Sequence, residues 1–204
     1  MIVVLISGRG SNLQALLDAG LPVSAVISNR ADAKGLESAA ACGIATRVVE
    51  HGRFATREDF DAALASEIDR WAPRVVVMAG FMRVLTPAFV ERYRGRLLNI
   101  HPSLLPAFPG LDTHARALAA GVKLHGCTVH FVTAELDHGP IVIQAAVPVR
   151  RTDTPQTLAA RVLRQEHVVY PQAVRWFLED KLVIASGVVH VEGNDAQLVL
   201  APDL

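Results

Sequence analysis

The sequence has little of what marks several common protein classes. Its 204 residues carry no net charge at pH 7, whereas nucleic-acid-binding proteins usually show a basic surplus or stripe. No apolar stretch approaches the roughly 20 residues that a membrane helix needs, and the apolar start lacks the basic leader of a signal peptide. The two cysteines, Cys42 and Cys127, form no CxxC pair, which argues against a zinc ribbon or a disulfide framework. We therefore expect a cytoplasmic protein that binds neither nucleic acid nor membrane.

Apolar side chains, in contrast, are plentiful. Hydrophobic residues make up 51% of the chain, and its length suits one α/β domain. In the first half, short β-branched runs alternate with helical patterns, which predicts an open, mostly parallel twisted sheet with helices on both faces. The expected strands are 2–7, 23–28, 46–50, 75–79 and 97–101, and the expected helices are 12–19, 34–41, 57–71 and 87–94.

The pattern changes after residue 101. Three prolines and a glycine between residues 102 and 110 predict a stiff loop. The tail resembles a weak strand pair around Gly187 and Gly193-Asn194. The elements expected in this half are a short helix over 114–120, strands over 127–132 and 141–147, and a long helix over 157–179.

Several helix starts carry capping residues. Ser11 and Gln14 have the spacing of a capping box. Thr56, Thr86 and Thr154 also precede helical patterns, and proline follows the last two. We therefore expect side-chain caps at these four helix starts.

A glycine-rich loop, residues 7–12, joins the first expected strand to the first expected helix. Glycines there let the backbone approach a ligand closely, and a helix start adds free N–H groups. The side chains of Ser11 and Asn12 could add hydrogen bonds to phosphate oxygens. The pattern favours a phosphate site over an ordinary tight turn. Because Leu13 stands where a dinucleotide fingerprint needs a third glycine, a single phosphate fits better than a pyrophosphate.

Asn99 and His101 lie two residues apart at the end of an expected strand, so their side chains share a face. Open α/β sheets bind ligands at the carboxyl ends of their strands. An amide beside an imidazole can stabilise an oxyanion that develops on a carbonyl. Asp137, in a loop between two expected strands, could keep His101 protonated or relay a proton. Together these residues suggest acyl transfer without a protein nucleophile, although a lone Asn or His near a strand end is more often structural and a loop Asp is usually just solvated.

A metal site is the alternative interpretation of the same region. No pair of ligand-type side chains has the tight helical spacing of a motif such as HExxH. The possible ligands are His101, Asp112, His114, His125, His130, Asp137 and His138.

Glu166 interrupts the apolar rows of the long C-terminal helix pattern. A charge inside an apolar stripe needs a partner or a function. A salt bridge to a nearby arginine and a contact with a ligand are both open.

Five stretches along the chain carry a family pattern. They are 5–13 (LISGRGSNL), 78–85 (MAGFMRVL), 98–106 (LNIHPSLLP), 125–132 (HGCTVHFV) and 139–144 (GPIVIQ). Read in order, they resemble the phosphoribosylglycinamide formyltransferases, a branch of the folate-dependent formyltransferases, over nearly the whole chain. The stretch 99–106 and the Asp137 loop are common to several such folds, whereas the Gly10-Ser11-Asn12 loop is typical of the glycinamide ribonucleotide branch.

The resemblance implies a Rossmann-like formyltransferase fold and a single domain over 1–204. In it, residues 1–100 bind the phosphate and ribonucleotide, and residues 101–204 bind folate and close the site. It also implies 10-formyltetrahydrofolate as co-substrate and no metal. The implied catalytic residues are Asn99, His101 and Asp137. The implied ribonucleotide contacts are Gly10, Ser11, Asn12, Arg57 and Glu166, and the implied folate contacts are Arg83, Val84, Leu85, Asn99 and Asp137.

The implied reaction is formyl transfer to the primary amine of glycinamide ribonucleotide, by direct attack through a tetrahedral intermediate. A formyltetrahydrofolate hydrolase is the nearest alternative, but such enzymes carry an extra amino-terminal domain. A transfer-RNA formyltransferase would need a further carboxy-terminal one. A non-catalytic nucleotide-binding module would leave Asn99, His101 and Asp137 unexplained. We expect a monomer or a homodimer. Asp112 and His138 depart from the family pattern, which has histidine and a small residue in some members.

Overall fold

The computed structural model describes residues 1–193 and 196–201. The chain forms two compact units, Met1–Asn99 and Ile100–Leu204, and the boundary falls inside strand β5 (Leu97–His101). We call them unit 1 and unit 2 and describe each by itself. Among the described residues, no helix combines the length and the apolar character needed to cross a membrane.

Unit 1 alternates strands and helices, as the sequence predicts. Its strands are β1 (Ile2–Ile6), β2 (Val23–Ser28), β3 (Ala45–Val48), β4 (Val75–Met78) and the first part of β5. Its helices are α1 (Ser11–Asp18), α2 (Lys34–Ala41), α3 (Arg57–Asp69) and α4 (Pro87–Arg92), with a 3₁₀ turn, η1 (His51–Arg53). Each paired neighbour in the order β3-β2-β1-β4-β5 is parallel.

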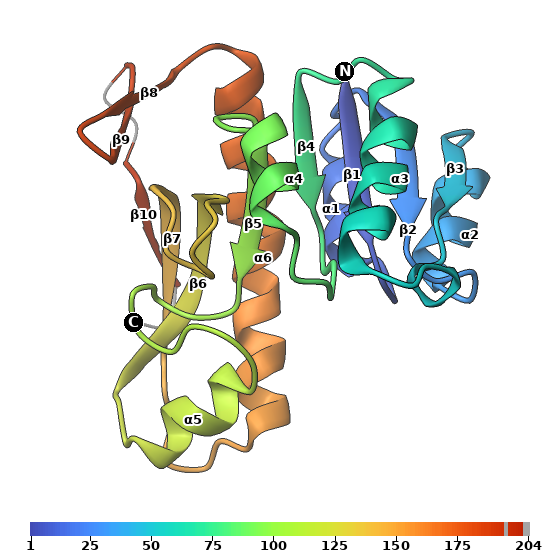
Figure 1. Ribbon diagram of the computed structural model, residues 1–204. Coiled ribbons are helices and arrows are strands. Elements are labelled where there is room, and N and C mark those ends of the chain that lie inside the picture. The colour runs from blue at the N-terminus through green and yellow to red at the C-terminus, as the bar shows by residue number, and fades with distance from the viewer. Residues whose placement is uncertain (194–195, 202–204) are drawn as a thin grey trace. The chain divides into compact units, whose positions relative to one another are not determined.

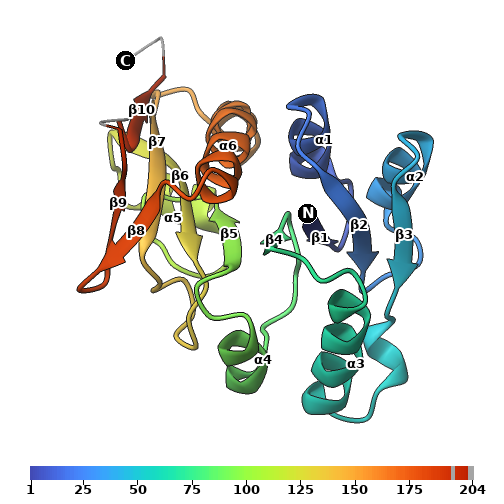
Figure 2. The same cartoon turned by 90° about the horizontal axis from the view of Figure 1, so that it is seen from above.

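The core of unit 1 lies on both sides of this sheet. Helices α1 and α2 cover one face, and α3 and α4 lie on the other (Figures 1 and 2). Every residue of β1 and β4 is buried, as expected for parallel strands with helices on both faces. Because β1 pairs in parallel with β2 and β4, the carboxyl ends of these three strands meet at one edge of the sheet.

Unit 2 is built around an antiparallel pair. Strands β6 (Leu124–Phe131) and β7 (Ile141–Pro148) pair antiparallel, and β10 (Leu198–Leu200) joins β7 in parallel. The long helix α6 (Pro155–Leu178) packs along β6 and β7 and contacts the short α5 (Thr113–Ala119) (Figure 1). Strands β8 (Leu182–Ala185) and β9 (Val188–Val191) form a separate hairpin.

The predicted α/β class with a mostly parallel sheet is confirmed, and most helix caps are where the sequence places them. Thr56, Thr86 and Thr154 each accept a backbone N–H of the following turn. Thr154 also forms a capping box with Thr157, so α6 begins two residues earlier than expected. The predicted capping box at Ser11 is wrong, because Gly10 occupies the N-cap position with φ of 78° and no side chain caps α1.

The tail is only partly as expected. The strand pair around Gly187 is present as β8 and β9. Asn194, the centre of the second predicted turn, lies outside the described residues. The following strand, β10, pairs with β7. Pairing between distant segments leaves no local pattern, which is why the tail alone did not indicate it.

Candidate active site

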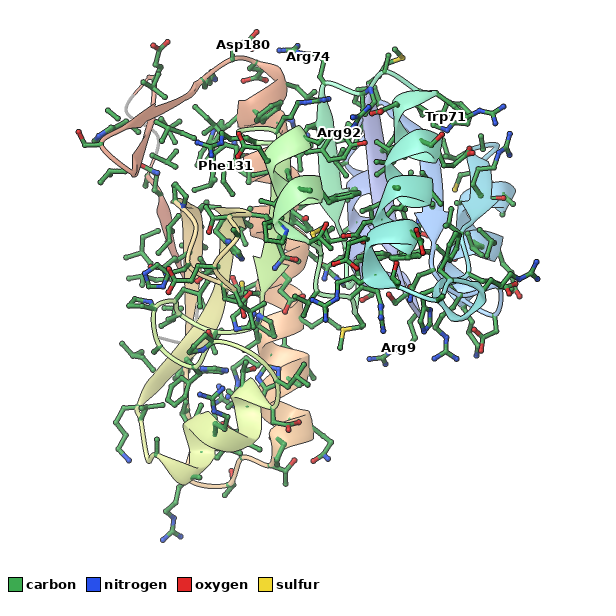
Figure 3. The ribbon with its side chains drawn as sticks, in the orientation of Figure 1. Arg9, Trp71, Arg74, Arg92, Phe131 and Asp180 are labelled. Atoms are coloured by element: carbon green, nitrogen blue, oxygen red, sulfur yellow. The ribbon has the colours of Figure 1, made fainter. Side chains whose placement is uncertain are left out.

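The glycine loop of unit 1 has the form of an anion site. Gly10 takes a left-handed conformation, and a Cβ there would lie 2.7 Å from the Cα of Gly35. Both facts require glycine at position 10. No side chain caps α1, and the positive end of its helix dipole lies at this loop, where it favours a negatively charged group. Arg9, in the same loop, points outward from the sheet edge (Figure 3). The loop can therefore hold an anion through backbone N–H groups.

Two further residues with predicted roles belong to unit 1. Arg57 is the first residue of α3 and is exposed. Arg83 lies between β4 and α4, and its Nε atom is buried without a hydrogen-bond partner in the described structure. Beside it, the apolar side chains of Met82 and Val84 are 66% and 55% exposed, whereas Leu85 is buried. These two exposed apolar side chains are available to contact an apolar part of a ligand.

Unit 2 brings His101 and Asp137 together. Asp137 Oδ2 lies 3.4 Å from Nδ1 of His101 and accepts the backbone N–H of Gly110 at 2.8 Å. Nε2 of His101 lies 3.0 Å from the carbonyl oxygen of Phe108. Since a carbonyl can only accept, Nε2 donates, and the remaining ring nitrogen faces a carboxylate. Both ring nitrogens therefore lie beside acceptor oxygens, an arrangement in which the ring can donate a hydrogen bond to a developing oxyanion.

The backbone around this pair is unusual. Phe108 and Asp137 have φ of 55° and 54°, a left-handed conformation that costs energy for residues other than glycine. Such conformations persist where surrounding contacts determine them, as the bonds to His101 and Gly110 do here. Asn99, two residues before His101 on β5, is half-buried.

His130 is a neighbour of Asp137 that sequence reasoning considered only as a metal ligand. Its Nε2 lies 3.9 Å from Asp137 Oδ1, and its Nδ1 lies 2.9 Å from the carbonyl oxygen of Phe131. Burial lowers the pKa of His130, so the neutral ring is favoured. Its position at the end of β6, facing the Asp137 loop, was the signal available in the sequence. The backbone contacts of Phe108 and Gly110 had no such signal.

Two further histidines of unit 2 contact each other. Nδ1 of His114 lies 3.2 Å from Nε2 of His125. Burial lowers both pKa values, that of His125 to about 4. Within the described part of the chain, no three His, Cys, Asp or Glu side chains are grouped so that they could hold a metal ion.

Glu166 lies in the middle of α6 and is only 7% exposed. Burial, and after it the charge of Glu166, raises the pKa of the Cys127 thiol well above its ordinary value. Cys127 therefore stays protonated and is a poor nucleophile. The predicted residues Gly10, Ser11, Asn12, Arg57, Arg83, Val84 and Leu85 belong to unit 1 with Asn99 at its end, whereas His101, Asp137 and Glu166 belong to unit 2.

Comparison with known proteins assigns the chain to a family. The family model described as formyl transferase matches residues 1–174, and the chain belongs to this family. Within it, the chain is 53% identical to phosphoribosylglycinamide formyltransferase of Escherichia coli, over 95% of this chain and 94% of that one. It is 44% identical to the human trifunctional purine biosynthetic protein adenosine-3, over 95% of this chain and 19% of that protein.

Solved structures agree with this assignment. The phosphoribosylglycinamide formyltransferase of Coxiella burnetii superposes with a TM-score of 0.91 at 46% identity, covering 98% of each chain. That of Brucella melitensis gives a TM-score of 0.83 at 50% identity, over 90% of this chain and 98% of the other. The predicted family, fold class and formyl-transfer chemistry are confirmed, and the hydrolase alternative is not favoured.

Proposed function

We propose that this chain transfers the formyl group of 10-formyltetrahydrofolate to the primary amine of glycinamide ribonucleotide in purine synthesis. The observation that carries the proposal is the buried pair of His101 and Asp137, 3.4 Å apart, in a chain 53% identical to a phosphoribosylglycinamide formyltransferase. A buried imidazole with a carboxylate partner supplies the charge and the proton acceptor that acyl transfer to an amine needs.

The reaction begins with attack by the neutral amine on the formyl carbon. The new carbon–nitrogen bond gives a tetrahedral adduct whose oxyanion receives hydrogen bonds from Asn99 and His101. Nε2 of His101 exchanges the Phe108 carbonyl for this oxygen. Asp137 balances the charge of the imidazolium and relays the amine proton, through water, to the folate nitrogen. The bond between the formyl carbon and that nitrogen then breaks, and tetrahydrofolate leaves. No step uses a metal ion.

The proposed binding residues divide between the two substrates. Backbone N–H groups of the glycine loop hold the phosphate at the start of α1. Glu166 accepts hydrogen bonds from the ribose hydroxyls. The ribonucleotide contacts are Gly10, Ser11, Asn12, Arg57 and Glu166. The folate contacts are Arg83, Val84 and Leu85, with Asn99 and Asp137.

The setting of the reaction follows from the same proposal. Both ligands are small molecules, and we expect the enzyme to act in the cytoplasm as a monomer or homodimer. The two cysteines, Cys42 and Cys127, are free, which fits a reducing compartment.

The test follows loss of the formyl group from 10-formyltetrahydrofolate with and without glycinamide ribonucleotide. We expect deformylation to depend on the ribonucleotide and to yield one formylated amine for each tetrahydrofolate. Glycinamide without ribose phosphate is the matched control, and it should be a far poorer acceptor because the glycine loop has nothing to bind. Equal rates with and without the amine would overturn the proposal in favour of a hydrolase. Binding of both substrates without turnover would favour a non-catalytic module.

A further inference from the structure

The segment between β4 and α4 in unit 1, residues 81–86, contains no helix or strand. It nevertheless presents Met82 and Val84 to the outside, 66% and 55% exposed, between the buried side chains of Phe81 and Leu85. Because its backbone lies outside any helix or strand, the conformation of this segment depends on contacts from elsewhere in the unit. Two buried polar side chains supply such contacts, one at each end.

Ser7 holds the first end. This residue follows β1 directly, and its Oγ accepts the backbone N–H of Met82 at 2.8 Å. The same hydroxyl donates to Asn29 Oδ1 at 2.6 Å, so its orientation is set. Asn29 is in turn held by His51, whose Nδ1 lies 3.1 Å from the side-chain amide nitrogen and 3.0 Å from the backbone carbonyl oxygen of Asn29 and bonds one or the other according to its tautomer. The hydroxyl of Ser7 is thus a preoriented acceptor.

Asp61 holds the second end. It lies on α3, is 3% exposed, and its Oδ2 accepts the backbone N–H of Thr86 at 2.6 Å. Its other oxygen is buried without a hydrogen-bond partner in the described structure. Burial of a carboxylate that forms so few bonds is unfavourable for stability. The bond from Asp61 thus fixes the backbone at Thr86, the N-cap residue of α4.

We propose that Ser7 and Asp61 are positioning residues that hold segment 82–85 in the conformation that binds the folate co-substrate. This inference rests on the proposed function, which assigns Arg83, Val84 and Leu85 to folate. The two side chains do not touch folate themselves. They fix the backbone at Met82 and Thr86, so that the residues between are ordered before the ligand arrives and less ordering entropy is lost on binding.

Steady-state kinetics on Ser7→Ala and Asp61→Ala test the proposal. Each should raise the KM for 10-formyltetrahydrofolate about five- to tenfold, the effect of one lost hydrogen bond. The KM for glycinamide ribonucleotide and kcat should stay within about twofold. Asp61→Asn keeps an acceptor oxygen and should restore folate affinity. Ser28→Ala is the matched control, because buried Ser28 ends the neighbouring strand and its Oγ accepts the N–H of Arg30 at 3.0 Å, away from the segment.

Amide hydrogen exchange of the ligand-free protein provides a readout that does not depend on activity. Ser7→Ala should speed exchange at Met82 about tenfold and Asp61→Ala should do so at Thr86, while Ser28→Ala changes neither.

Unchanged exchange at both amides would overturn the proposal. So would folate KM values within twofold of the parent, an equal rise in both KM values, or an Asp61→Asn variant that behaves like Asp61→Ala. A parent protein that binds no folate would overturn the proposed function, and the exchange data would still decide whether these side chains hold the segment.

Discussion

The two units differ in how they present polar groups. In unit 1 the groups are mainly neutral: a glycine loop lies at the start of α1, and the hydroxyl of Ser7, oriented by the amide of Asn29, accepts a backbone N–H. In unit 2 the groups are ionisable and buried, with His130 and His101 on either side of Asp137. Neutral preoriented groups suit binding, whereas coupled ionisable groups suit proton movement. Changes at the glycine loop and Ser7 should therefore act on affinity, and changes at the His101–Asp137 pair should act on turnover.

Asp137→Asn tests this division with the largest expected effect. The amide keeps the shape of the side chain but removes the negative charge 3.4 Å from His101. The oxyanion then loses its charged donor and the proton relay loses its carboxylate, and such a group contributes about 10²–10⁴-fold. We expect kcat to fall at least about a hundredfold, ~2.7 kcal/mol of barrier. Both substrates should still bind within a few-fold of the parent in direct titrations.

Asp112→Asn is the control for this variant. Asp112 also lies in unit 2 with a left-handed φ of 55°, but it is exposed and does not cap α5 through its side chain. Its replacement should leave turnover nearly unchanged. Near-normal turnover of Asp137→Asn would show that Asp137 is a loop residue only, and the proposed catalytic trio would be wrong.

Local patterns predicted most elements of both units, because the features that start and end them are local. Proline after Thr86 and Thr154 marked two helix starts, and buried β-branched runs marked the parallel strands. The prediction at Ser11 was wrong because Gly10, which is left-handed and packs closely against Gly35, takes the N-cap position one residue earlier. That approach is tertiary and invisible in one sequence.

The site was less accessible to sequence reasoning than the fold. Asn99 and His101 share a strand, so their common face could be predicted from spacing. The contact between His101 and Asp137 joins distant segments, and the family resemblance suggested it where no spacing rule could. The bonds from the backbone of Phe108 and Gly110 depend on conformation alone, so residue types gave no indication of them.

Glu166→Ala tests an exception to this division between binding and turnover. Glu166 is a proposed binding residue, but it lies in unit 2. If its carboxylate holds the ribose hydroxyls, its loss removes hydrogen bonds to a charged group, each contributing roughly 1.5–3 kcal/mol. Affinity for glycinamide ribonucleotide should fall about ten- to a hundredfold, while affinity for folate stays near the parent value in calorimetric titration. Glu179→Ala at the end of the same helix, where the carboxylate pairs with Lys181 at 2.9 Å, should change neither. Joint loss of both affinities with global unfolding would indicate a structural salt bridge instead.

The smallest expected effect is a difference in stability between two variants at helix starts, one in each unit. Thr154 accepts the N–H of Thr157 at 3.2 Å, so Thr154→Ala should lower the free energy of unfolding by about 1 kcal/mol. Ser11 makes no such bond, because α1 is capped by Gly10. Ser11→Ala should therefore change the unfolding free energy by less than about 0.5 kcal/mol, since it removes no cap. Its affinity for the ribonucleotide should nevertheless fall by up to about tenfold if, as we propose, the Ser11 hydroxyl contacts phosphate. Urea unfolding of both variants and titration with glycinamide ribonucleotide measure the two quantities separately. Equal destabilisation by both substitutions would show that Ser11 is a structural cap. It would contradict the proposed anion site at the start of α1.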